Sequence, residues 1–219
     1  MSLLRRDGWR VIGAALLAGA CGGGSATQPP GPPSQLVTNG GDGQSWYYNN
    51  PLPVQLSVKA LDVNNQPVPG AVVSWAVASG SGGVSSVQDT TDGNGVARVT
   101  DSIGPSTLQR VTATLAATTV ATVTFTEAAT APPTATAVDI NDNYFSPQSV
   151  VIKAGGTVTW TWRGANLHTL TFTGGPTPLP ANQASQSTGT APRTITTVGG
   201  YTYVCTNHAG MKGTVTAVH

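Results

Sequence analysis

Three side chains near the end of the chain recur at intervals of three residues: Cys205, His208 and Met211. They offer a thiolate, an imidazole and a thioether, which are the soft and borderline donors that copper prefers. A second imidazole is available upstream, although the chain has only three His, two Cys and two Met. Two His and one Cys in a trigonal plane, with a weak axial Met, form a blue-copper electron-transfer site. The sequence therefore predicts one mononuclear copper site, with four ligands: His168, Cys205, His208 and Met211.

Other chemistries remain open for these four residues. A Cys and a His can act as nucleophile and base, although the sequence has no evident orienting third group or oxyanion loop. Zn²⁺ also accepts two His and one Cys with an open fourth position. A single His or Met is most often an ordinary packing residue. The coincidence of all the donor types of a copper site in one pattern favours copper over these alternatives.

The first twenty residues have the pattern of a targeting segment. Arginines precede a short apolar stretch at 11–20, which is too short to span a bilayer. Small residues then lead to Cys21 and resemble a bacterial lipobox. We expect a lipoprotein signal peptide over 1–20, a lipid on Cys21, and an anchored protein in the periplasm or on the cell surface; an ordinary secretory signal is the alternative. With Cys21 lipidated, Cys205 has no cysteine partner for an internal disulfide, and metal ligation is one of its few stable fates.

Composition predicts an all-β protein. Charged residues make up 9% of the chain, which has 27 Gly and 16 Pro and almost no run that could form an amphipathic helix. The net charge is +1 and the basic residues are scattered, so nucleic acid is not an expected partner. A Gly/Pro/Ser-rich tether at 21–35 and a linker at 128–135 leave two domains, 36–127 and 136–219, each of a size that suits one β-sandwich.

In the second domain, alternation of side chains predicts which residues face the core. Val158, Trp160 and Trp162 alternate with threonines, which indicates a half-buried strand with an aromatic inner face. By the same alternation His168 and Cys205 point inward near the ends of their strands. His208 lies outside any alternation, so we expect it to be the more exposed of the two imidazoles.

The first domain shows several short strands with turn signals between them. Their inward positions are Val54, Leu56 and Val58; Val73, Trp75 and Val77; and Val111, Ala113 and Leu115. The run 58–75 resembles the bacterial immunoglobulin-like repeats of invasin and intimin, which implies a sandwich over 36–127. Because no functional site is evident in this stretch, we expect the domain to act as a spacer. Turn-like contexts are predicted for the carboxylates Asp62, Asp89, Asp92 and Asp101. Calcium binding by Asp89 and Asp92 is the alternative to a turn role for that pair.

The second domain resembles the plastocyanin and amicyanin group of cupredoxins over residues 136–219. The motifs that carry the resemblance are Tyr144-Phe-Ser-Pro147, Ala154-Gly-Gly-Thr-Val158-Thr-Trp160, Asn166-Leu-His168-Thr-Leu-Thr-Phe172 and Gly200-Tyr-Thr-Tyr-Val-Cys205-Thr-Asn-His208-Ala-Gly-Met211. The resemblance implies a Greek-key sandwich in which His168, Cys205, His208 and Met211 ligate one type 1 copper. Two positions depart from the family: Thr169 replaces an Asn that ties the ligand loops together, and Asn207 replaces a common Pro.

The function expected from this resemblance is single-electron transfer between proteins, by a monomer that is a carrier and not an enzyme. A redox partner such as a c-type cytochrome or another copper protein would meet the exposed His through an apolar patch that includes Leu167 and Ala209, with little electrostatic steering. A copper oxidase or nitrite reductase would need further His clusters, and His219 is the one imidazole left. Copper storage or delivery, and adhesion through the first domain, are the alternative functions.

Overall fold

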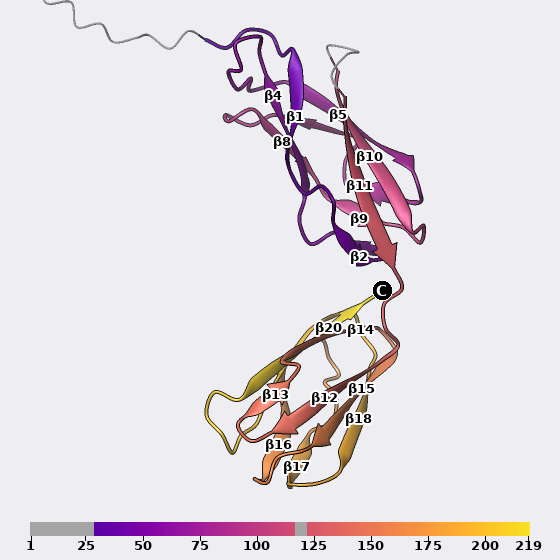
Figure 1. Cartoon of the computed structure of the whole chain (residues 1–219), viewed down its shortest axis with the longest axis vertical. Helices are drawn as coiled ribbons and strands as arrows, with labels where there is room; N and C mark the ends of the chain where they lie inside the picture. Colours follow the sequence, from indigo (N-terminus) through magenta and orange to yellow (C-terminus); the bar gives the residue numbers. More distant parts are fainter. Residues whose placement is uncertain (1–28, 117–121) are drawn as a thin grey trace, which may run out of the picture.

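The computed structural model describes residues 29–116 and 122–219 of the chain. All regular elements in these ranges are β-strands, and they form two groups of sheets joined by residues 131–134 (Figure 1). This confirms the predicted all-β class. The described part of the chain contains no helix that is long and apolar enough to cross a membrane. The predicted signal peptide, Cys21 and the first part of the tether lie outside the described residues.

The N-terminal domain contains three sheets. The first has the order β1 (Gln35–Gly40), β4 (Leu56–Leu61) and β8 (Val96–Val99). The second has the order β2 (Ser45–Tyr47), β11 (Thr122–Thr130), β10 (Leu108–Leu115), β5 (Val72–Ser79) and β7 (Gln88–Thr90). The third has the order β3 (Asn50–Pro51), β9 (Asp101–Ile103) and β6 (Gly82–Val84). Trp75 and Phe125 pack together in the core between them, with their ring centroids 5.9 Å apart.

Three predictions for this domain were wrong. Val54 precedes β4 and is 56% exposed, so the inward alternation begins only at Leu56. Asp101 is not in a turn: it is the first residue of β9 and only 1% exposed. The burial alternation of Ala97 and Val99 continues past Thr100, so Asp101 and Ile103 point inward and Ser102 points outward. Asp89 is not in a turn either: it is the middle residue of the edge strand β7. Asp62 and Asp92 do lie in turns, and each accepts backbone N–H groups.

The C-terminal domain is a sandwich of two sheets. One has the order β13 (Tyr144–Ser146), β12 (Ala135–Asn141), β15 (Gly156–Trp162) and β18 (Thr190–Ile195). The other has the order β14 (Ser149–Lys153), β20 (Lys212–Val218), β19 (Gly199–Val204), β16 (His168–Gly174) and β17 (Gln183–Gln186). Strands β16 and β19 are neighbours although β17 and β18 separate them in sequence, so residues far apart along the chain meet at the end of this pair.

Aromatic side chains fill the core of this sandwich beneath that end. Trp160 meets Phe172 and Tyr203 edge to face, with ring centroids 5.6 and 5.3 Å apart. Burial alternates along the whole of β15, as the sequence predicts. Edge-to-face aromatic packing adds to the burial of large apolar surfaces, so the strands that carry the site residues rest on a well-packed base.

Candidate metal centre

Two neighbouring strands and one loop place the predicted ligands. His168 is the first residue of β16, and Cys205 directly follows β19. His208 and Met211 lie on the loop from β19 to β20. This loop is closed by two backbone hydrogen bonds, Cys205 N–H to Met211 O at 3.0 Å and Met211 N–H to His208 O at 3.2 Å. Gly210 has a φ of +82°, a conformation that favours glycine, and it allows the chain to turn before Met211.

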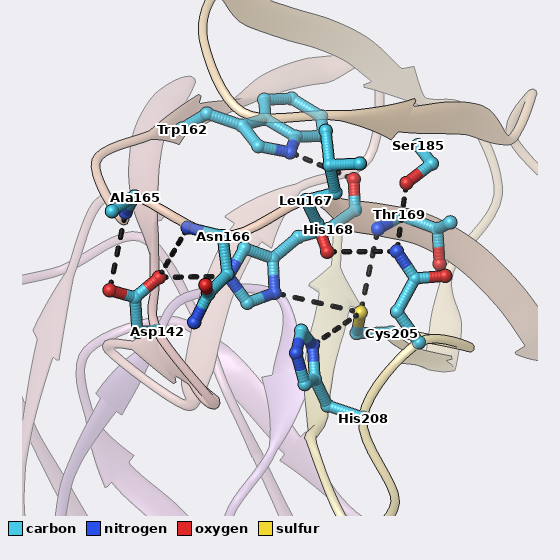
Figure 2. A network of polar contacts seen from close by, with 11 residues as sticks. Asp142, Trp162, Ala165, Asn166, Leu167, His168, Thr169, Ser185, Cys205 and His208 are labelled. Atoms are coloured by element: carbon cyan, nitrogen blue, oxygen red, sulfur yellow. Dashed lines mark hydrogen bonds and ion pairs between the residues drawn. The ribbon is translucent and has the colours of Figure 1, made fainter.

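The thiol of Cys205 lies between two imidazoles. Its Sγ is 3.6 Å from Nδ1 of His168 and 3.4 Å from Nδ1 of His208, as Figure 2 shows. The three donor atoms all lie within 4.8 Å of one another. Both rings turn Nδ1 toward the sulfur, although they come from different parts of the chain. Three donor atoms converging on one point is the arrangement that a metal ion requires, and two nitrogens with one sulfur suit copper or zinc.

The burial of the four residues differs in a way that bears on function. His168 is fully buried, and Cys205 and Met211 are each 3% exposed and belong to the hydrophobic core. His208 is only partly buried, as its place outside the strand alternation predicts. The site therefore lies at the rim of the core, with one imidazole edge directed toward the surface.

Asp142 holds the far side of the His168 ring, and sequence reasoning missed it. His168 Nε2 lies 3.3 Å from Asp142 Oδ1. Backbone N–H groups of Asn166 and Ala165, together with the His168 ring, lower the pKa of Asp142 below its usual value. A carboxylate can only accept, so Nε2 carries the ring proton and the lone pair of Nδ1 is directed to the site. An Asp in a turn is ordinary, so only the fold reveals this contact.

The two departures from the family pattern both tie the ligand loops together. Thr169 Oγ1 accepts the N–H of Thr206 at 2.8 Å, which joins β16 to the loop after Cys205. Asn207 Nδ2 donates to Leu167 O and to Ser185 Oγ, each at 2.8 Å. Thr169 N–H also points at Cys205 Sγ, 3.4 Å away, where it can stabilise negative charge on sulfur. Thus a Thr and an Asn in this chain supply ties that hold the site in shape.

The sandwich fold and the three converging donor atoms are typical of a small β-sheet domain that binds a metal ion. Comparison with known proteins identifies the family of this domain. Residues 133–218 match the copper binding proteins of the plastocyanin/azurin family. A plastocyanin from Scenedesmus fuscus is 40% identical over 82 residues, which cover 33% of this chain and 84% of that protein. The chain therefore belongs to the plastocyanin/azurin family through its C-terminal domain.

Solved structures that match the chain include an amicyanin mutant and a purple cupredoxin. A mutant of amicyanin in the Cu(I) form is 29% identical, with a TM-score of 0.35, and the match covers 38% of this chain and 82% of that one. A purple cupredoxin from Nitrosopumilus maritimus is 28% identical, with a TM-score of 0.34, and the match covers 37% of this chain and 98% of that one. The match to the plastocyanin/azurin family covers only the C-terminal domain, so the immunoglobulin-like character of the N-terminal domain stays a prediction.

Proposed function

We propose that the protein is an electron carrier that binds one type 1 copper ion in its C-terminal domain. The observation that carries this proposal is the position of the Cys205 sulfur, which is buried between the Nδ1 atoms of His168 and His208. Met211, buried on the same loop, would be the weak axial ligand. When bound, copper supplies a one-electron couple between Cu(II) and Cu(I).

The residues around the site suit a metal that gains and loses charge without moving its ligands. Asp142 orients His168, and Thr169 braces the loop after Cys205, so the donor atoms are held in place before metal arrives. Rigid placement of this kind lowers the reorganisation that accompanies each electron transfer.

Electrons would enter and leave through the partly exposed edge of His208. Leu167 is 57% exposed, and its carbonyl oxygen accepts a hydrogen bond from Asn207, the neighbour of His208. Leu167 therefore lies at the same rim as the exposed imidazole, and Leu179 is a further exposed apolar residue of this domain. We propose that this rim docks a redox protein, such as a c-type cytochrome or another copper protein, in a short-lived contact.

The targeting pattern at the N-terminus supports a location outside the cytoplasm. We propose that a lipid on Cys21 anchors the protein in the periplasm or at the cell surface, and that the N-terminal domain lifts the copper domain off the membrane as a spacer. Residues 1–20 would then be removed as a signal peptide.

A visible spectrum after addition of Cu(II) to the purified protein tests the copper proposal. We expect an intense blue thiolate-to-copper band that ascorbate bleaches and air restores. Cys205→Ser should abolish the band, whereas Cys21→Ser, which changes the other cysteine of the chain, should keep it. A colourless protein that still binds one metal ion would overturn electron transfer in favour of zinc binding or copper delivery. No metal binding at all would leave adhesion as the function to test.

A further inference from the structure

The connection that leads into His168 is built around a carboxylate from another part of the chain. Residues 163–167 join β15 to β16, and Asp142 lies on the short turn between β12 and β13. Asp142 Oδ1 accepts the N–H of Asn166 at 2.9 Å, and its Oδ2 accepts the N–H of Ala165 at 3.2 Å. Figure 2 shows the carboxylate in contact with these two N–H groups and with the His168 ring. One side chain therefore holds both the connection and the imidazole.

Gly164 is the residue against which this carboxylate packs. A Cβ added at Gly164 would lie 2.8 Å from the backbone nitrogen of Asp142 and 2.9 Å from its Cγ, and closer still to Oδ1. Carbon atoms in van der Waals contact are about 3.5–4.0 Å apart, so a side chain at residue 164 and the carboxylate compete for the same space. The carboxylate can approach the connection here because residue 164 has no side chain.

The backbone of Gly164 does not itself require glycine. Gly155 and Gly210 in the same domain have positive φ angles, whereas Gly164 does not. A residue with a side chain can therefore adopt the backbone conformation of Gly164. The requirement for glycine at this position comes from the approach of Asp142 and not from the turn.

Backbone hydrogen bonds prevent the two turns from separating to make room. The N–H groups of Arg163 and Gly164 both donate to the carbonyl oxygen of Ile140, at 2.8 and 3.1 Å. Ile140 is fully buried in β12, two residues before Asp142. The distance between the connection and the β12–β13 turn is thus fixed, so a side chain at residue 164 would displace the Asp142 carboxylate instead.

The orientation of the His168 ring depends on this carboxylate, because the backbone of His168 is held by other groups. The carbonyl oxygen of His168 accepts the Nε1–H of Trp162 at 2.9 Å. The ring itself is fully buried, and its Nε2 contacts Asp142. Displacement of the carboxylate would leave a buried N–H without an acceptor, and a proton on Nδ1 would then compete with metal binding there.

We propose that Gly164 is a positioning residue for the metal centre: it admits the Asp142 carboxylate, which in turn directs the Nδ1 lone pair of His168 toward Cys205. The three atoms nearest to a Cβ at residue 164 all belong to Asp142, so a side chain there reaches His168 through that carboxylate. The effect on copper rests on the proposed function, whereas the effect on the ring is a property of the metal-free protein.

Long-range ¹H–¹⁵N spectra of the histidine rings in the full-length, metal-free protein test this role. We expect His168 to be protonated on Nε2 in the unaltered protein and to be a mixture of tautomers in Gly164→Ala. Cu(II) affinity in a competition titration should fall about 10–100-fold in that variant. Gly200→Ala is the matched control, because its φ is not positive and an added Cβ would meet nothing within 4 Å. It should change neither readout.

A double-mutant cycle separates an action through Asp142 from a general loss of structure. Asp142→Ala opens the space beside residue 164, so Gly164→Ala added to it should cause no further change in tautomer or in copper affinity. A further loss of about tenfold in the double variant would overturn the proposal, and so would a single Nε2–H tautomer in Gly164→Ala. If Gly164→Ala alone does not fold, the comparison of Asp142→Ala with the double variant decides the matter. Failure of the unaltered protein to bind copper would overturn the proposed function, and the tautomer of His168 would still decide the role of Gly164.

Discussion

The two domains bury polar groups in opposite ways. In the C-terminal domain the buried donors face one another, and each has a further partner: His168 has Asp142, and Cys205 has the N–H of Thr169. In the N-terminal domain Asp101 is buried with neither oxygen partnered. Within the described residues, three donor atoms lie close enough to hold a metal ion only in the C-terminal domain. The comparison teaches that buried polar groups form a site where their donor atoms converge and hydrogen bonds hold them there, whereas the burial of Asp101 without a partner only raises the pKa of its carboxyl.

The largest effect, on copper affinity, is expected from removing one of the proposed ligands in the C-terminal domain. His168→Ala removes a buried Nδ1 donor and leaves Asp142 without its ring partner. We expect copper affinity to fall by more than about 100-fold, because changes in outer-shell partners alone cost about 10–100-fold. His219→Ala, at an exposed residue outside the cluster, is the control. Equal affinities of the two variants in a competition titration would show that His168 is not a ligand.

The stability of the N-terminal domain should depend on pH, because two of its carboxyls are buried. Burial raises the pKa of Asp101 from 3.8 to about 6 and that of Glu127 from 4.5 to about 7, with Asp42 and Asp101 adding to the second shift. The folded state then binds more protons than the unfolded state. We therefore expect the free energy of unfolding to fall as pH rises from about 4 to about 7, by at most about 3 kcal/mol per group.

Urea unfolding at a series of pH values measures this loss. Glu127→Gln should remove the part of the slope between about pH 4.5 and 7, and Asp89→Asn should not change it. A stability that rises over the same range would contradict the burial of two unpaired carboxylates.

Loss of the contact between Asp142 and His168 is expected to have an intermediate effect on copper affinity. Asp142→Asn keeps the shape of the side chain but removes its charge and one acceptor, so the His168 tautomer is less firmly held. We expect a 10–100-fold weaker Cu(II) affinity. The ¹⁵N shifts of His168 in the metal-free protein should also move toward a mixture of tautomers. Asp139→Asn, which breaks only an exposed pair with Arg163, should do neither.

A smaller effect is expected from loss of the hydrogen bond between Thr169 and Thr206, which ties the two ligand loops together. Thr169→Val leaves the N–H of Thr206 without its acceptor, and we expect the free energy of unfolding to fall by about 1–2 kcal/mol. The blue band should shift but persist, because no ligand is lost. Thr173→Val, at an exposed site further along β16, should leave the band unchanged. A band unchanged in both variants would mean that Thr169 does not hold the site.

The smallest effect is expected from a change in ionic strength, measured on the rate of electron exchange with a redox partner. The rim near His208 is apolar at Leu167, and charged residues make up only 9% of the chain. The rate of electron exchange with a c-type cytochrome should change less than about threefold between 20 and 300 mM salt. Stopped-flow measurement of that rate is the test. A steep salt dependence would point to a charged docking surface instead.

Sequence reasoning was most successful where inward and outward side chains alternate along a single strand. The strict alternation of β15 and the inward positions of His168 and Cys205 could be predicted, because successive strand residues point to opposite faces. Asp101 was misplaced although the inward positions of Ala97 and Val99 continue to it, because an Asp is expected at the surface or in a turn and not in a core. Asp142 was overlooked because the sequence around an Asp in a turn is the same whether or not an imidazole, here that of His168, contacts its carboxylate.

The sequence by itself determined that Cys205, His208 and Met211 lie close together, since they belong to one short loop and their spacing survives any packing of the sheets. Tertiary structure alone decided that His168 meets this loop, through the pairing of β16 with β19, and that Asp142 holds its far side. It also decided that Asp101 and Glu127 are buried in the N-terminal domain. The physical reason is that contacts between strands depend on which sheets pack together, whereas loop spacing is set by the covalent chain.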